Sequence, residues 1–327
     1  MGIVRLGFLS TARINEQLLA GARPSNLVDV VAVASRDRAR AEAYAREHSI
    51  GRAYGSYEEL LADPEVEAVY VSLPNSLHVD WSIRALDAGK HVLCEKPLTR
   101  RPEEAERAFD AAERAGRLLM EAFMYRHHPQ TARVKQLVDD GAIGTVRAIR
   151  GVFSFDLLAA RDPSDVRLNA ELEGGSLMDV GCYCVSGARL LAGEPERVFG
   201  EAVPAPSGVD MAFHGTLRFP SDVVAQFHSS LELPFKQELE VLGAEASLLV
   251  EAPWRVDLGG EVLLRRASGQ ERIEVEEADA YRLELENLAA AIRGDAPPLI
   301  GRDDAVGQAR TIAALYRSAE AGEAVAP

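Results

Sequence analysis

The sequence predicts two domains: an α/β domain with a parallel sheet, followed by an α+β domain with a large, open, mixed or antiparallel sheet. Over the first 120 residues, short apolar runs alternate with helical stretches, which is typical of a parallel sheet with helices on both faces. From Val146 onward, long runs of strand character indicate a sheet with one covered face. The length of 327 residues agrees with two domains.

The first domain is expected at residues 1–123, with strands at 4–9, 28–34, 68–73, 91–94 and 118–120. The helices between these strands are indicated by residues that cap a helix, begin it or end it: Asp37, Ser56, Gly89, Pro102 and Gly116.

The second domain is expected at residues 124–300. Its strands are predicted at 146–157, 209–219, 222–233 and 236–243, and its helices at 129–139, 176–191 and 281–293. Residues 301–327 form a third segment with a helix over 303–321, whose apolar stripe is typical of core packing.

Composition excludes several classes of function. The 36 basic and 51 acidic residues give a net charge of −15, which argues against nucleic-acid or anionic-membrane partners. No apolar run approaches the roughly 20 residues of a membrane span, and the N-terminus lacks the pattern of a signal peptide. Cys94, Cys182 and Cys184 form no metal-ligand pattern. We expect a cytoplasmic protein with reduced thiols and no metal.

The turn after the first strand is the first candidate binding segment. In a doubly wound Rossmann domain this turn faces the pyrophosphate of a dinucleotide, but here the usual G-x-G-x-x-G reads S-x-A-x-x-N. An ordinary polar turn is the alternative interpretation. The strand–helix–strand context favours the cofactor, and the candidate cofactor-binding residues are Ser10, Thr11, Ala12, Arg13 and Ile14.

The tip of the second strand indicates which dinucleotide is bound. NAD sites usually place a carboxylate there, whereas this chain has Ser35 and then Arg36, and a guanidinium pairs well with a 2′-phosphate. The alternative is a solvated arginine. We interpret Asp37 as the N-cap of the following helix and not as a ligand of the ribose. The sequence favours NADP(H), with NAD(H) still possible.

Two further segments follow strands of the same sheet and are therefore expected at the edge where ligands bind, so their residues are candidates for cofactor binding. The first contains Leu73, Pro74 and Asn75, with His78 either beside the site or a simple helix-start residue. The second runs from an apolar strand into Glu95 and Lys96, and a half-buried lysine needs a partner or a function.

These segments resemble the Gfo/Idh/MocA family of oxidoreductases. The resemblance rests on Pro74-Asn75, on Glu95-Lys96-Pro97, and on the stretches 121–129 and 174–183, and it extends over nearly the whole chain. Within the family, the chain is most similar to the dimeric dihydrodiol dehydrogenases and the NADP-dependent D-xylose dehydrogenases.

The resemblance implies several properties that the residues alone do not give. It implies a cis Lys96-Pro97 bond, a homodimer or homotetramer built on the C-terminal sheet, and a C-terminal helix packed back on the Rossmann domain. It also implies that Tyr125, Arg126 and Asn169 lie near the substrate. Arg167, His127 and His128 are further candidates in the same regions. Tyr183 stands where inositol dehydrogenases generally carry histidine, which counts against an inositol substrate.

Lys96, Asp179 and Tyr183 are the candidate catalytic residues. Asp179 and Tyr183 are four residues apart, so a helix over 176–191 would project both from one face. Tyrosine with a pKa near 10 is a poor base, but a neighbouring lysine cation lowers that pKa. Tyr183 would then exchange the substrate proton, while Asp179 orients the substrate or holds Lys96. The alternative is that Tyr183 is a packed aromatic and Asp179 a surface residue.

The sequence therefore predicts an NADP(H)-dependent oxidoreductase that transfers a hydride to or from a carbon of a sugar, ketosugar or dihydrodiol. A nucleotide-sugar ketoreductase or an inositol-type dehydrogenase is the alternative among enzymes. A non-catalytic, dinucleotide-sensing regulator is the alternative from another class.

Overall fold

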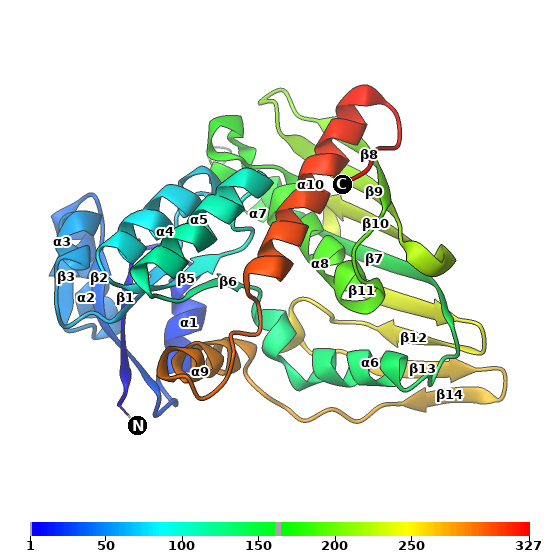
Figure 1. The fold of residues 1–327 in the computed structure, drawn as a ribbon, viewed down its shortest axis with the longest axis horizontal. Helices are drawn as coiled ribbons and strands as arrows, with labels where there is room; N and C mark the ends of the chain where they lie inside the picture. Colours follow the sequence, from blue (N-terminus) through cyan, green and yellow to red (C-terminus); the bar gives the residue numbers. More distant parts are fainter. Residues whose placement is uncertain (1, 161–164) are drawn as a thin grey trace. The chain divides into compact units, whose positions relative to one another are not determined.

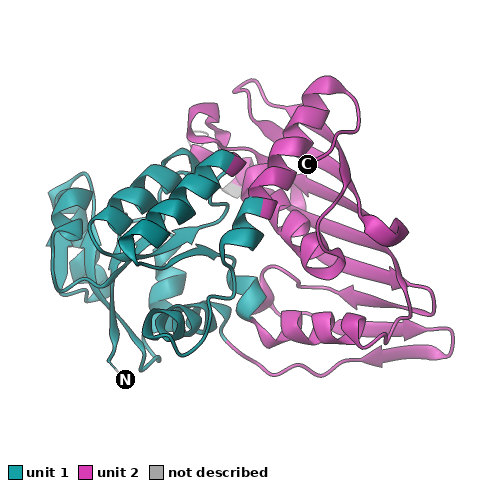
Figure 2. Cartoon of the chain, in the orientation of Figure 1, with its two compact units in different colours: residues 1–99, 103–127, 279–306 teal, residues 100–102, 128–278, 307–327 magenta. Residues whose placement is uncertain are grey.

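The computed structural model describes residues 2–160 and 165–327. The chain divides into two compact units, coloured separately in Figure 2. The first contains residues 1–99, 103–127 and 279–306, and the second contains residues 100–102, 128–278 and 307–327.

The first unit is built on a six-stranded parallel sheet with the order β3-β2-β1-β4-β5-β6 (Figure 1). The strand order reverses between β1 and β4, and in such sheets the ligand crevice lies at the carboxyl ends of the strands flanking this switch point. The sheet confirms the expected Rossmann fold. Its strands are β1 (Val4–Phe8), β2 (Val28–Ala34), β3 (Arg52–Tyr54), β4 (Ala68–Val71), β5 (His91–Glu95) and β6 (Leu119–Ala122).

Capping side chains begin two of the helices as expected. Asp37 accepts hydrogen bonds from the N–H groups of Ala39 and Arg40, and the Ser56 hydroxyl accepts one from Glu59. The helices of this unit are α1 (Asn15–Ala22), α2 (Arg38–His48), α3 (Tyr57–Leu61), α4 (His78–Asp87), α5 (Pro102–Ala115) and α9 (Ala280–Arg293), with short 3-10 turns η1 (Asn75–Leu77) and η2 (Met124–His127).

Helix α9 joins the first unit although it follows the whole second sheet in sequence. It packs on α1, where Gly21 lies so close to the backbone of Arg282 that an added Cβ would be 2.7 Å from its nitrogen. Arg293, at the end of α9, forms an ion pair with Glu67.

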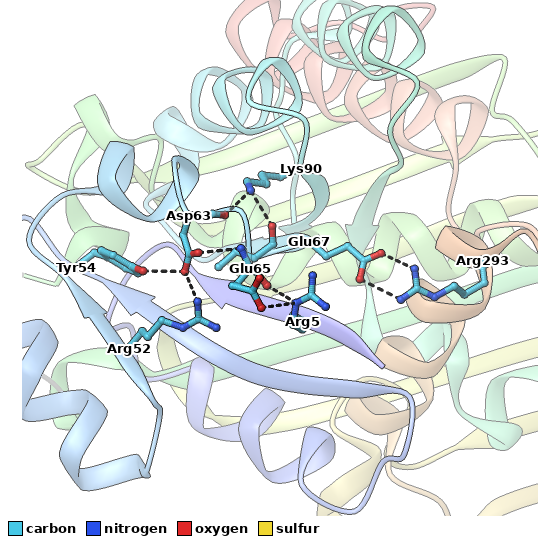
Figure 3. A network of polar contacts seen from close by, with 9 residues as sticks. Arg5, Arg52, Tyr54, Asp63, Glu65, Glu67, Lys90 and Arg293 are labelled. Carbon is cyan, nitrogen blue, oxygen red and sulfur yellow. Dashed lines mark hydrogen bonds and ion pairs between the residues drawn. The ribbon is translucent and has the colours of Figure 1, made fainter. Parts of the chain in front are cut away.

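Charged side chains tie together the amino ends of the strands in the first unit (Figure 3). The buried Lys90 ammonium donates to the carbonyl oxygens of Asp63 and Val66, at 2.6 and 2.7 Å. The Asp63 carboxylate accepts from Arg52 and from the Tyr54 hydroxyl, at 2.8 and 2.7 Å. This network lies at the edge opposite to the ligand-binding one, so we assign it to stability.

The second unit contains an eight-stranded sheet with the order β14-β13-β12-β11-β7-β10-β9-β8. All neighbours are antiparallel except β7 and β10, which are parallel, so the sheet is mixed. Its strands are β7 (Val146–Asp156), β8 (Arg197–Pro204), β9 (Asp210–Arg218), β10 (Val224–Ser230), β11 (Glu232–Gly243), β12 (Ala246–Val250), β13 (Val262–Arg266) and β14 (Gly269–Arg272).

Four of these strands, β8, β12, β13 and β14, were not predicted. Every residue of β14 is exposed, and β8 exposes the large apolar side chains Phe199 and Val203, so neither strand has the apolar alternation of a half-buried strand. Strands β12 and β13 are each only five residues long.

Helices cover one face of the second sheet. Helix α8 (Cys182–Ala192) packs on β7 and β10, and α6 (Pro129–Asp139) packs on α8. The fully buried Trp254 lies under α8 and donates from its indole N–H to the Val152 carbonyl, at 3.1 Å. The remaining α-helices with residues in this unit are α7 (Leu157–Ala160) and α10 (Arg302–Ala321).

Most of α10 belongs to the second unit. Gln308 donates to the Cys182 carbonyl at 2.7 Å, and the Tyr316 hydroxyl donates to Asp210 at 2.9 Å. The sequence-based segments 1–123, 124–300 and 301–327 placed α9 in the second domain and α10 in a third segment. The compact units instead group α9 with the first unit and most of α10 with the second. The predicted domain boundaries stay a prediction.

We expect His91 to make stability depend on pH. Burial lowers the pKa of His91 to about 4, and its Nδ1 accepts a hydrogen bond from the Leu118 N–H at 3.0 Å. An unfolded histidine takes up its proton near pH 6.5, before the folded one does, so the free energy of unfolding falls as the pH drops from 6.5 towards 4. In His91→Asn, the amide oxygen keeps the acceptor but takes up no proton. Urea unfolding between pH 4 and 7 should show a shallower decline for the variant, and parallel curves would contradict this account.

Candidate functional site

A buried hydrogen-bond cluster shapes the turn after β1. The Ser10 hydroxyl lies 3.0 Å from the Ser72 carbonyl oxygen and 2.7 Å from the Ser72 hydroxyl. Ser72 donates to the Asn15 side-chain oxygen at 2.6 Å, and the Asn15 amide donates to the Ser10 carbonyl at 2.8 Å. The cluster therefore joins the carboxyl ends of β1 and β4, the two strands at the switch point.

This cluster changes the expected role of Ser10. Its hydroxyl also accepts from the Ala12 N–H at 3.0 Å, and the residue is only 9% exposed, so the hydroxyl serves the turn itself. Thr11, Ala12 and Ile14 are half-buried and Arg13 is exposed, which leaves them to face a ligand. Ser72 was not predicted as a site residue, although a polar residue directly after the apolar β4 was a usable signal.

Three polar residues at the tip of β2, Ser35, Arg36 and Asp37, make different contacts. Ser35 is buried and its hydroxyl accepts from the Asp37 N–H at 3.3 Å, while Asp37 caps α2. Arg36 is exposed and lies near the Tyr57 hydroxyl. The strand thus presents a guanidinium where a carboxylate would accept a ribose hydroxyl, and this arrangement fits a 2′-phosphate.

The segments after β4 and β5 lie at the same edge. After β4, the buried Leu73 leads through Pro74 into the 3-10 turn η1, which begins at Asn75. At the end of β5, Glu95 accepts from the Tyr70 hydroxyl, and Lys96, which follows the strand, is half-exposed. The Lys96-Pro97 bond is cis, as the resemblance implied.

His78 supports this edge. It is 1% exposed, with Nε2 at 2.8 Å from the Leu73 carbonyl oxygen and Nδ1 at 2.9 Å from that of Pro97. The ring therefore contacts backbone rather than lining an open surface.

Tyr125 and Arg126 lie in η2 of the first unit. Tyr125 is 2% exposed and packs edge-on against Phe123. The Arg126 guanidinium forms an ion pair with Asp304 at 3.0 Å, and only 9% of its side chain is exposed.

The helix predicted over 176–191 begins differently from an ordinary α-helix. Residues Leu177–Gly181 form a π-helical turn, and α8 starts only at Cys182. Asp179 lies in the π turn and Tyr183 in the first turn of α8, so the helix expected over 176–191 is a regular α-helix only from Cys182 onward. Inserted π turns often occur at functional sites because they re-aim side chains.

Asp179 forms an ion pair with Arg167. The guanidinium Nε lies 2.8 Å from Asp179, and Nη1 lies 3.2 Å from Asp165. These carboxylates, Asp179 first, raise the pKa of Arg167 further above its ordinary value despite burial. Asn169 uses its side-chain oxygen to accept from the Glu171 N–H at 2.8 Å, which begins a 3-10 turn.

Tyr183 lies among aromatic residues. It is 6% exposed, with ring centroids 5.5 Å from Phe153 and 6.1 Å from Trp254. These contacts fix the ring plane, and both the catalytic and the packing interpretation require such contacts.

Asp210 anchors the start of the π turn. Its buried carboxylate accepts from the Ser176 hydroxyl at 2.8 Å, the Leu177 N–H at 2.7 Å and the Tyr316 hydroxyl at 2.9 Å. Gly175 has a φ of +110°, and a Cβ there would lie 2.3 Å from Asp210. Sequence reasoning missed Asp210, which stands alone as a charge at the start of an apolar strand.

Each unit thus gathers part of the predicted residue set. The first brings the turn after β1, the tip of β2 and the Glu95-Lys96 segment to one edge of its sheet, and the second brings Asp179, Arg167 and Tyr183 to one end of α8. Among the residues that the structure describes, no cluster of three potential ligands could hold a metal ion. No helix in the described ranges is long and apolar enough to cross a membrane.

Comparison with known proteins identifies the family. Residues 2–123 match the oxidoreductase family with an NAD-binding Rossmann fold, GFO/IDH/MocA, and residues 131–249 match the GFO/IDH/MocA C-terminal domain. The chain belongs to this oxidoreductase family, which confirms the resemblance seen in the sequence.

Several relatives are similar over most of their length. The D-xylose 1-dehydrogenase (NADP(+)) 2 of Haloferax volcanii is 43% identical over 98% of both chains. The trans-1,2-dihydrobenzene-1,2-diol dehydrogenase of Danio rerio is 34% identical over 76% of this chain and 75% of its own. The crystal structure of a 3-ketoreductase from Actinomadura kijaniata with NADP and TDP-benzene is 30% identical, with a TM-score of 0.90 over 97% of this chain and 98% of that one.

Asp210 gives a test of how the π turn is held. Asp210→Ala removes the acceptor for three donors and should lower the free energy of unfolding by about 3 kcal/mol, whereas Tyr316→Phe removes one donor and should cost about 1 kcal/mol. Urea unfolding of both variants provides the comparison. Equal losses in the two variants would show that the contacts with Ser176 and Leu177 contribute nothing.

Proposed function

We propose that this chain is an NADP(H)-dependent oxidoreductase that interconverts a hydroxyl and a carbonyl group of a sugar, ketosugar or dihydrodiol. The observation that carries the proposal is the 43% identity to an NADP-dependent D-xylose dehydrogenase, combined with Lys96 at the ligand-binding edge of the sheet. The bound nicotinamide would accept or supply the hydride.

Cofactor specificity rests on residues of the first unit. Thr11, Ala12, Arg13 and Ile14 at the start of α1 suit a pyrophosphate, since a small residue permits close approach and the helix amino end favours an anion. The exposed Arg36 favours the 2′-phosphate of NADP over NAD.

Proton transfer is assigned to Tyr183, which exchanges a proton with the reacting oxygen. Lys96 favours the anionic form of the tyrosine, since a nearby cation stabilises a phenolate. Asp179, held by Arg167, orients the substrate hydroxyls with Tyr125, Arg126 and Asn169 at the rim. Crystal structures of the 3-ketoreductase relative include variants with a tyrosine changed to phenylalanine and a lysine changed to alanine or glutamate, and these are the two residue types assigned here.

The relatives leave two substrate classes to compare. Xylose and dihydrodiol dehydrogenases suggest a small free substrate, whereas the 3-ketoreductase was crystallised with TDP-benzene. We favour the small substrate because the greater identity, 43%, is to the xylose enzyme. Turnover of a nucleotide-linked ketosugar with no free sugar oxidised would favour the other class.

Assembly and location follow from the same proposal. The first unit would bind the dinucleotide, and the second would bind the substrate and form a cytoplasmic homodimer or homotetramer through its sheet. The exposed Phe199 and Val203 on β8 support such an interface.

Replacing Tyr183 by phenylalanine should remove the proton donor and keep the aromatic packing. We expect kcat to fall by about 100-fold or more, because general acid–base catalysis contributes roughly that much, while the Kd for NADPH stays unchanged. Steady-state rates with D-xylose and a panel of sugars and diols give the measurement. Tyr44→Phe on α2 is the matched control, and full activity of Tyr183→Phe would contradict the assignment.

Replacing Arg36 by alanine should weaken NADPH binding by about 10- to 100-fold, the effect of losing one charge-assisted hydrogen bond to phosphate. Binding of NADH should change little, because it has no 2′-phosphate. Arg38→Ala is the control, since Arg38 forms an ion pair with Glu59 at 2.6 Å. Equal losses for both cofactors would show that Arg36 does not read the 2′-phosphate.

A further inference from the structure

The His78 ring connects two backbone segments that the sheet itself leaves unconnected. The parallel ladder between β4 and β5 ends at the pair Val71 and Cys94. Beyond it, the Leu73 carbonyl oxygen lies 2.8 Å from Nε2 of His78, and the Pro97 carbonyl oxygen lies 2.9 Å from Nδ1. The ring thus takes the place of further ladder hydrogen bonds.

Both partners of the ring are carbonyl oxygens, which only accept hydrogen bonds. A neutral ring carries one N–H and donates to only one of them, so both contacts are hydrogen bonds only in the protonated ring. Burial lowers the pKa of His78, whereas the two carbonyl contacts oppose that shift. Because the ring is 1% exposed, neither carbonyl can exchange it for water without opening this part of the fold.

The two segments carry different parts of the proposed site. Leu73 precedes Pro74 and Asn75, which we assign to the cofactor, and Pro97 follows Lys96, which we assign to the chemistry. On its far side, the second segment is anchored by the Leu98 N–H, which donates to the buried Glu121 at 2.7 Å. On the side of the cofactor segment, the Pro97 carbonyl oxygen of this second segment contacts the His78 ring.

We propose that His78 is a positioning residue that holds the cofactor-binding turn after β4 and the Lys96 segment after β5 at a fixed separation, so that bound NADPH and Lys96 meet in the reactive geometry. This inference rests on the proposed function of Lys96. It adds that the two ring nitrogens serve two separable purposes.

Two substitutions divide the ring into its halves. The Asn side-chain nitrogen occupies roughly the place of Nδ1, so His78→Asn keeps a donor for Pro97. The Gln side-chain nitrogen occupies roughly the place of Nε2, so His78→Gln keeps a donor for Leu73. His78→Leu keeps neither. His91→Asn, at the opposite end of β5, is the matched control for changing a buried histidine.

The variants should change kcat and the Kd for NADPH independently of one another. We expect His78→Gln to lower kcat by about 10-fold with little change in the Kd for NADPH, and His78→Asn to raise that Kd by about 10-fold with little change in kcat, since one hydrogen bond contributes about 1 kcal/mol. His78→Leu should show both effects, and His91→Asn neither. Equal changes in kcat and Kd for the Asn and Gln variants, or no change in either, would overturn the proposal.

If the variants fail to fold, a measurement on the unaltered chain can still test the proposal. In protein labelled with ¹⁵N-histidine, the buried His78 ring signal should shift when NADPH is added, because the turn that it contacts binds the cofactor. An unchanged signal at saturating NADPH would also overturn the proposal. An unaltered chain that binds NADPH but reduces no substrate would instead count against the proposed function.

Discussion

The first unit depends on how the carboxyl ends of its parallel strands are held once the ladder hydrogen bonds stop. A binding edge must leave backbone groups free for a ligand, yet it must not fray. Two sets of side-chain contacts meet both requirements. The Ser72 hydroxyl and the Asn15 amide fasten β1 to β4 at the switch point, and the His78 ring fastens the segments after β4 and β5. Each uses short, buried polar groups whose loss would leave unsatisfied partners.

In the second unit, charged side chains support an irregular stretch of backbone. A π turn is less regular than an α-helix, so the backbone around Asp179 needs support from outside the helix. Asp210 supplies three acceptor contacts at the beginning of the turn, and Arg167 fixes the Asp179 carboxylate from the other side. Phe153 of β7 and Trp254, which follows β12, then pack against the Tyr183 ring. A carboxylate and a phenol are thus each held by several contacts, which suits the acid–base role proposed for Tyr183.

Sequence reasoning succeeded where one local signal was enough. Asp37 and Ser56 begin helices because their side chains satisfy free backbone N–H groups, and apolar alternation located β7, β9 and β10. It could not foresee contacts with partners distant in sequence. Ser10 was expected to face phosphate, but Ser72 engages its hydroxyl. Asp179 was expected in one regular α-helix with Tyr183, but it lies in the anchored π turn.

The sequence by itself determined the fold class of each domain, the family, and the residue types available for chemistry, because these depend on local pattern and composition. The tertiary structure decided which of those residues can face a ligand. His78, Ser10 and Arg167 all carry groups suited to binding, yet each is engaged by the fold: two carbonyl oxygens, a neighbouring hydroxyl and a pair of carboxylates. The physical reason is that a buried polar group must be paired, and its partner becomes known only when distant segments are brought together.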